Sequence, residues 1–236
     1  MATHASVNDI LFPPFTGFPP EGLAFLRRLK KNNTRPWFQK HKHEYEELVR
    51  FPMQCLIAEL RDAMAMAAPE LNIDPRRSIF RIYRDVRFSK NKAPFKTHIA
   101  ASFNLRGRKG PTEQPGLYLH IGPEEVFIGG GLYMPASPQL KKLRAAMVED
   151  PEEFLAVVRD PAFRRLFGTL QGDRLIRAPL GFPADHPMID HLKQKQFYVG
   201  VERDEGDVLR PRFAADVQKV FVRCLPLIRW LANALQ

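Results

Sequence analysis

A change of hydrophobic period near residue 78 constrains the fold of this chain more than any other sequence feature. Before it, apolar residues recur every three to four positions, as in amphipathic helices, whereas after it they alternate with polar residues, as in strands. Short turns separate the alternating segments, which favours antiparallel pairing and a sheet with one apolar face. We expect strands at 78–84, 98–105, 117–121, 126–134 and 196–203, and a short one at 173–178.

Helical patterns occupy most of the remaining sequence. Asp150 and Asp160 each precede a proline, a pattern that is typical of a helix start. We expect helices at 21–31, 36–48, 52–67, 138–149, from 151, from 161 to Gly168, at 187–193 and at 211–235. The whole pattern predicts a single α+β domain over 21–236, in which helices pack mainly on one face of an antiparallel sheet. Residues 1–20 are expected to form a tail that lies loosely on this body.

Composition excludes several classes of protein. The chain has 236 residues, and no window approaches the roughly 18–20 uncharged apolar residues that cross a bilayer. No signal peptide is visible at the N-terminus, so we expect a cytoplasmic protein without a membrane partner. Cys55 and Cys224 lie in apolar helical patterns and are expected to be buried, reduced thiols. No CxxC or HExxH motif is present, and we expect neither a metal site nor a cofactor.

Basic charge is concentrated in one segment. Residues 76–98 hold eight Lys or Arg residues and one acid, although the whole chain carries a net charge of only +10. Alternation over 78–84 places Phe80 and Ile82 on one face and Arg81 on the other, and the following loop brings further cations to one end of the sheet. The candidate anion-binding residues are Arg81, Tyr83, Arg84, Arg87, Lys90, Lys92 and Lys96. Alternatively, several of these cations only solvate the loop or pair with surface acids.

Three residues are weaker candidates for acid–base chemistry. His98 and His120 fall on the predicted polar face of the sheet, where we also expect Ser102 and Tyr118. Asp85 is expected mainly to pair with a neighbouring arginine and fix the loop, because nearby cations lower the pKa of a carboxyl group and weaken it as a base. The triple glycine at 129–131 lacks the ending of a phosphate-binding P-loop, so it favours close backbone approach within a strand.

The segment SIFRIYRDVRFSKNKAPFKTHIAASF resembles the domain of unknown function 2461 family, together with NNTRPWFQKHKHEYE upstream and PGLYLHIGPEEVFIGGGLYMP downstream. The resemblance covers nearly the whole chain from about Phe18. It implies one intact domain and marks residues 81–98 as the characteristic segment of the family. It implies no particular reaction.

Two functions of different classes fit these residues. The favoured one is binding of a phosphorylated or other anionic small molecule in a basic pocket built by residues 81–98, with hydrolase or transferase activity as a possible extension. The alternative is a nucleic-acid-binding or regulatory module that uses the same basic loop and residues 106–110 (RGRKG). A protein-interaction role stays open as a third hypothesis.

Overall fold

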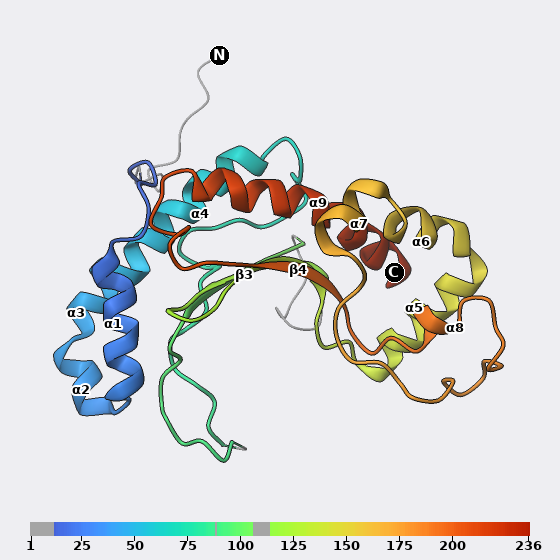
Figure 1. Cartoon of the computed structure of the whole chain (residues 1–236), viewed down its shortest axis with the longest axis horizontal. Coiled ribbons are helices and arrows are strands. Elements are labelled where there is room, and N and C mark those ends of the chain that lie inside the picture. Colours follow the sequence, from blue (N-terminus) through green and yellow to red (C-terminus); the bar gives the residue numbers. More distant parts are fainter. Residues whose placement is uncertain (1–11, 88, 106–113) are drawn as a thin grey trace.

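The computed structural model describes residues 12–87, 89–105 and 114–236, which form an α+β structure around a four-stranded antiparallel sheet (Figure 1). The strands, in their order across the sheet, are β1 (Ile99–Asn104), β2 (Gly116–Ile121), β3 (Val126–Leu132) and β4 (Phe197–Arg203). Sequential antiparallel pairing follows from the short turns, and the predicted α+β class with an antiparallel sheet is confirmed.

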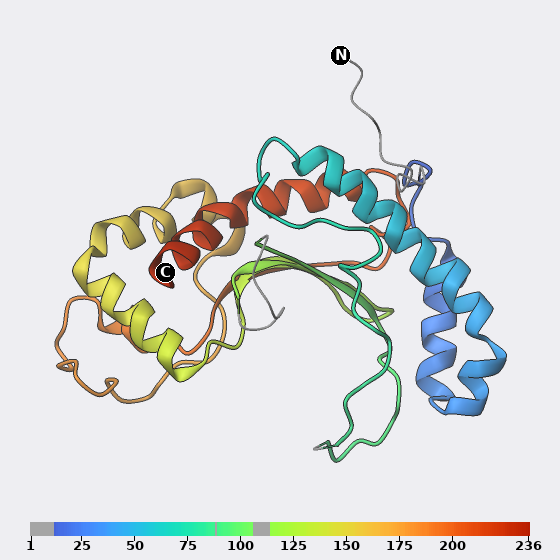
Figure 2. The ribbon, with the colours of Figure 1, turned by 180° about the vertical axis from the view of Figure 1, so that it is seen from behind.

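One face of the sheet forms the hydrophobic core. Alternation places Ala101, Leu119 and Ile128 on this face, and all three are fully buried. Helices α9 (Phe213–Ala234) and α4 (Phe51–Met64) lie over it in Figures 1 and 2, as the prediction of helices on one face requires. Buried residues form one continuous cluster along the chain from Phe15 to Leu231, which agrees with a single domain.

Shorter helices flank the two ends of the strands, and no helix of the described residues covers the other face of the sheet (Figures 1 and 2). The first group is α1 (Pro20–Lys31), α2 (Arg35–Lys40), α3 (Lys42–Tyr45) and the π-helical turn η1 (Glu46–Arg50); the second is α5 (Ser137–Glu149), α6 (Pro151–Val158), α7 (Pro161–Phe167) and α8 (Ile189–Leu192). The predicted N-caps are confirmed, because Asp150 accepts a hydrogen bond from the N–H of Glu153 and Asp160 from that of Phe163. The predicted helix at 36–48 is interrupted at His41.

Two of the predicted strands are wrong as regular strands. Segment 78–84 forms only isolated bridges, Ile79 with Ala101 and Tyr83 with Phe95. Segment 173–178 likewise forms a single bridge, between Arg174 and Gln194. Each segment has β-prone residues, but continuous pairing needs a neighbouring strand along its whole length, and the fold supplies one only at single positions.

The predicted loose tail is also wrong over its described part, residues 12–20. Phe15 and Phe18 are 4% and 3% exposed and belong to the core cluster. The N–H of Phe15 donates a hydrogen bond to the carboxylate of Glu59, and that of Phe18 donates to the carbonyl of Val208. Burial of two aromatic rings offsets the entropy of ordering this segment.

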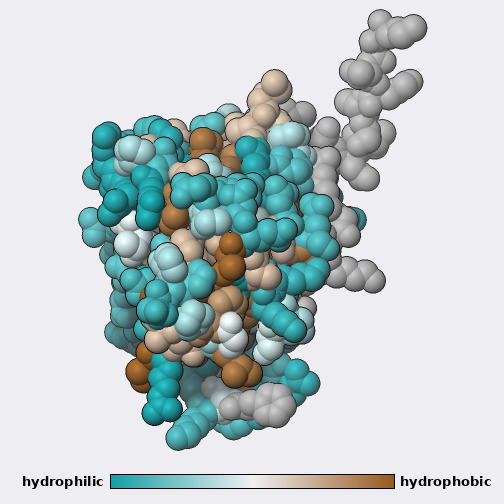
Figure 3. Space-filling view, turned by 90° about the vertical axis from the view of Figure 1, so that its right-hand side faces the viewer, coloured by the Kyte–Doolittle hydropathy of each residue, from teal (hydrophilic) through white to brown (hydrophobic). Residues whose placement is uncertain are grey.

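The surface on the side of α5, α6 and α8 carries a stripe of hydrophobic residues among hydrophilic ones (Figure 3). Large apolar side chains exposed in this part of the chain include Ile176 and Leu180, at 96% and 102%. Among the described residues, none of the helices combines the length and the apolar character that a membrane span requires. Cys55 and Cys224 are both buried as free thiols, as expected.

Candidate functional site

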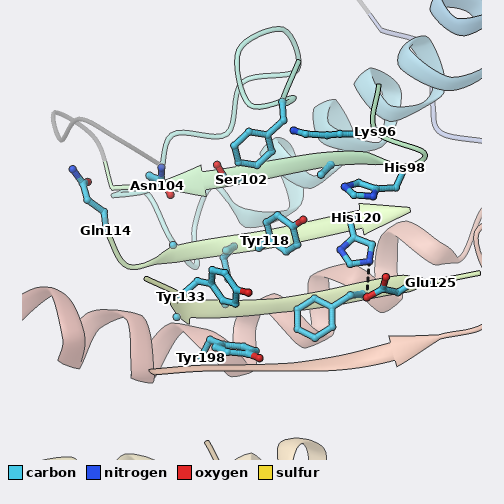
Figure 4. A pocket seen from close by; sticks show the side chains of 17 residues that line it. Lys96, His98, Ser102, Asn104, Gln114, Tyr118, His120, Glu125, Tyr133 and Tyr198 are labelled. Atoms are coloured by element: carbon cyan, nitrogen blue, oxygen red, sulfur yellow. Dashed lines mark ion pairs between the residues drawn. The ribbon is translucent and has the colours of Figure 1, made fainter. Parts of the chain in front are cut away.

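The face of the sheet opposite α9 carries a cavity of about 480 Å³. All four strands and the segment 80–98 contribute to its wall, so residues far apart in the sequence meet there (Figure 4). Its polar and aromatic lining residues are Phe80, Lys96, His98, Ser102, Asn104, Gln114, Tyr118, His120, Glu125, Phe127, Tyr133 and Tyr198.

Strand alternation and register build this wall. Every second position of β1 and its approach, namely His98, Ala100, Ser102 and Asn104, points to the same side and lines the cavity. The register sets Ser102 opposite Tyr118 and Ala100 opposite His120. The polar face expected for His98, Ser102, Tyr118 and His120 is therefore present, and it is the wall of the cavity.

His98 and His120 lie side by side at one end of the cavity. Their ring centroids are 5.2 Å apart, and the His120 ring is stacked on Phe127 at 5.9 Å. His120 is only 8% exposed, and its Nε2 lies 3.3 Å from Oε1 of Glu125 (dashed in Figure 4). The geometry of this contact does not make a hydrogen bond, and Nε2 has no hydrogen-bond partner among the described residues.

Burial keeps both imidazoles neutral. It lowers the pKa of His120 to about 4, and burial followed by the proximity of His120 and Lys96 lowers the pKa of His98 to about 4 as well. For His98 the Glu125 carboxylate opposes this change, but its side chain is 66% exposed and water screens its charge. Near neutral pH the pair can therefore accept hydrogen bonds or a proton, but it supplies no positive charge.

Lys96 is the cation of the cavity. Its Nζ lies 5.0 Å from the centroid of the Phe80 ring, and partial burial, followed by the charge of Arg81, lowers the pKa of the ammonium group. Within the described ranges, Lys96 forms no ion pair with a carboxylate. Burial, followed by the charge of Glu125, raises the pKa of Tyr118 to about 12, so its hydroxyl stays a neutral hydrogen-bond donor.

Most of the predicted anion-binding residues lie outside this wall. Among the seven candidates only Lys96 lines the cavity, where it meets the candidate histidines His98 and His120. Arg81, Tyr83 and Lys90 are exposed. The isolated bridge at Ile79 turns Phe80 towards the cavity, so its neighbour Arg81 points away.

Several cations hold the loop itself together. Arg84 donates hydrogen bonds to the carbonyl of Ala93 and to the hydroxyl of Ser89, both at 3.5 Å. Lys92 donates to the carbonyl of Val86 at 3.0 Å.

Asp85 pairs with Arg87, as we expected for an aspartate that fixes the loop. Nη2 of Arg87 lies 2.7 Å from Oδ2 of Asp85. Hydrogen bonds from the side chain and the backbone of Arg87 lower the pKa of the Asp85 carboxyl to about 2, so this exposed carboxylate is a weak base. The general-base alternative therefore finds no support in the geometry of the loop.

Sequence reasoning missed the aromatic part of the wall. Phe127, Tyr133 and Tyr198 come from β3, from the chain just after it and from β4, and only the order of the strands brings them together. Glycines leave room for large side chains on both faces of the sheet, for the Phe127 ring on the cavity face and for Ile228 on the core face. A Cβ at Gly200 would lie 2.1 Å from the Phe127 ring, and one at Gly130 would lie 3.0 Å from Ile228 of α9. A Cβ at Gly129 would lie 2.2 Å from the carbonyl oxygen of Val199, and one at Gly131 would lie 2.2 Å from that of Phe197, which confirms the predicted close backbone approach at the triple glycine. Gly130 and Gly131 also line the cavity.

No group of three or more His, Cys, Asp or Glu side chains converges as a metal site in the part of the chain that the structure describes. The cavity instead offers one ammonium group, two neutral imidazoles, hydroxyl groups and amides. These groups suit hydrogen bonding and proton transfer to an organic ligand.

A family model described as "Conserved hypothetical protein (DUF2461)" matches residues 21–230. The match spans most of the chain, and the chain belongs to this family. No curated protein and no solved structure gives a significant match.

Proposed function

We propose that this member of the DUF2461 family binds a phosphorylated or other anionic small molecule in the cavity, with Lys96 as the group that holds the anion. The observation that carries the proposal is the position of Lys96, which is half-buried in the wall and has no ion-pair partner among the described residues. A desolvated ammonium group without a counter-ion is costly, so an anionic ligand would stabilise it.

The neighbouring groups support anion binding by hydrogen bonds. Ser102 and Tyr118 face each other across β1 and β2, and both carry hydroxyl groups that donate to a phosphate or carboxylate oxygen. Among the described lining residues, the only carboxylate is that of Glu125, which lies beside His120 (Figure 4). The volume of the cavity falls within the roughly 300–1,000 Å³ of small-molecule sites.

The same wall supports the hydrolase or transferase activity that the sequence left open as an addition to anion binding. A neutral imidazole can accept a proton from water or from a hydroxyl group, and His98 and His120 are both neutral near pH 7. Their pKa of about 4 makes each a weak base, so proton acceptance depends on groups that stabilise the imidazolium. Glu125, at 3.3 Å from Nε2 of His120, would stabilise the imidazolium that forms. We propose proton acceptance by this pair as its chemical role.

The test is binding of small anions to the wild-type protein and to two matched variants. Isothermal titration with inorganic phosphate, ribose 5-phosphate and nucleoside monophosphates is expected to show binding that Lys96→Met weakens at least tenfold. Lys90→Met removes an exposed charge of the same segment and is expected to leave the affinity within twofold. Absence of binding by every small anion, or equal losses in both variants, would contradict the proposal.

Nucleic-acid binding is the second candidate, and the exposure of Arg81 and Lys90 favours it. The predicted contribution of residues 106–110 lies outside the described residues. A polynucleotide held by the loop would bind more weakly to Lys90→Met, which lacks one cation. Its affinity would also fall as the salt concentration rises, because binding releases counter-ions from the phosphates. The variant that serves as the control for the cavity is therefore the diagnostic variant for this alternative.

A further inference from the structure

The end of the cavity away from the histidines is a recess in the sheet surface. The register aligns Asn104, Gly116, Gly131 and Tyr198 in one row across all four strands. The two central positions have no side chain, so bare backbone forms the floor between Asn104 and Tyr198. Gly131 has φ +136° and a Cβ there would lie 2.5 Å from Cα of Tyr198, so this conformation and spacing require glycine.

Aromatic rings stand around this floor. Tyr118 belongs to the adjacent row, and Tyr133 and Tyr198 meet edge to face with ring centroids 5.4 Å apart. The ring centroid of Phe127 lies 6.3 Å from that of Tyr118 and 6.4 Å from that of Tyr198. Figure 4 shows Tyr118, Tyr133 and Tyr198 on the same side of the sheet, between the histidines at one end and Asn104 and Gln114 at the other. A flat recess walled by rings fits a planar ring, which gains contact area and favourable ring–ring geometry there.

A buried acceptor lies at the end of the recess. Oδ1 of Asn104 is inaccessible to solvent and accepts no hydrogen bond from any described residue. It occupies the space of the missing Gly116 side chain, 2.3 Å from where a Cβ would be, so the amide is held against the sheet. Buried polar atoms normally have partners. A turn of the Asn104 amide away from the sheet would bring Oδ1 to the recess, where a ligand N–H would supply the missing partner.

The spacing joins this recess to the cation. Phe80, over whose ring Lys96 lies, donates its N–H to the carbonyl of Ala100, four residues before Asn104 in β1. Four residues of strand rise about 13 Å, enough for an anionic group, a short linker and a planar ring in line. Inorganic phosphate or a sugar phosphate would leave both the recess and Oδ1 of Asn104 unused.

We infer that the ligand carries its anionic group on a planar heteroaromatic ring with an N–H donor, which is the chemistry of a nucleoside monophosphate. The inference rests on the proposed function, because it takes Lys96 as the anion site. It adds the ring between the tyrosines and the N–H bound to Asn104.

The experiment separates the anion from the ring. Isothermal titration compares the four common nucleoside 5′-monophosphates with ribose 5-phosphate, which lacks the base, and with adenosine, which lacks the phosphate. We expect at least one nucleotide to bind tenfold or more tightly than ribose 5-phosphate. Asn104→Ala is expected to remove most of that difference and to leave the affinity for ribose 5-phosphate within twofold.

A second variant protects the test against loss of folding. The side chain of Tyr133 is 55% exposed, so Tyr133→Ala is expected to fold and to weaken nucleotide binding several-fold, again without an effect on ribose 5-phosphate. Circular dichroism and melting temperature check both variants.

The outcomes distinguish the two proposals. Equal affinity for ribose 5-phosphate and every nucleotide overturns the inference about the ring and leaves the anion site intact. Nucleotide binding that Lys96→Met abolishes but both recess variants leave unchanged overturns it too. Binding of none of these anions overturns the proposed function together with the inference.

Discussion

The two faces of the sheet differ in what they contribute, although the same strands build both. On the α9 face, Ala101, Phe103 and Leu119 are fully buried in the core. On the opposite face, Ser102 and Tyr118 are partly accessible and carry polar groups into the cavity. A shift of one residue along β1 thus separates a position that stabilises the fold from one that contacts a ligand. We expect substitutions on the first face to change stability and those on the second to change binding.

The largest expected effect is the truncation of a core residue beside a cavity residue. Phe103 is fully buried and its ring lies 5.6 Å from that of Phe221 in α9. Phe103→Ala is expected to lower the free energy of unfolding by about 3–5 kcal/mol, because it removes buried apolar area and leaves a hole. Ser102→Ala, one position away, is expected to cost less than about 1 kcal/mol. Urea unfolding of both variants measures this difference, and similar losses would contradict the division between the faces.

A smaller effect is expected from acid, and it arises on the cavity face. The unfolded chain protonates histidine near pH 6.5, whereas folded His98 and His120 have a pKa of about 4. Between these values the unfolded state binds more protons, so stability falls as the pH drops through 6.5 towards 4, and the cost fades above pH 6.5. From pH 7 to pH 5 we expect a loss of about 2 kcal/mol for His120 and less for the more exposed His98.

Urea unfolding at pH 7 and pH 5 tests this expectation. His120→Gln is expected to reduce the acid-induced loss of stability, whereas His43→Gln is expected to leave it unchanged, because the side chain of His43 is 81% exposed. An acid loss of the same size in His120→Gln and in the wild type would show that this imidazole is not the cause.

The smallest effect is expected in the basic loop. Asp85 and Arg87 form an exposed pair, and such pairs contribute little because water screens them. Asp85→Asn is therefore expected to leave the melting temperature and the affinity for small anions unchanged within error. A loss of small-anion binding in this variant would move the binding site from the cavity to the loop.

Local patterns were enough to predict most elements of the fold. The alternation over 98–105 correctly divides Phe103 from Ser102, because side-chain direction in a strand depends only on position parity. The helix starts at Asp150 and Asp160 were predictable for a similar reason, since a cap acts within three residues. The side-chain directions in segment 78–84 were not predictable, because they depend on where the segment touches β1 rather than on its own residues.

The candidate site was predictable only in part. His98, His120 and Lys96 were found as polar residues on or beside strands, and they do meet in the cavity. Tyr133 and Tyr198 were missed because they lie far along the chain from that segment. Charge density drew attention to the whole basic segment, but charge alone does not say whether a side chain points into a cavity, into solvent or back to its own loop.

The sequence by itself determined the four strands of the sheet, its apolar face and the strand residues that share its polar face, because these depend on the two-residue period of a strand. The tertiary structure alone decided which cations reach the cavity, how deeply the histidines are buried and which rings complete the wall. Those properties depend on the order of the four strands and on contacts between distant segments, such as Phe80 beside Ala100 and Phe127 over Gly200. Burial and proximity, which set the pKa of each imidazole, exist only once those contacts have formed.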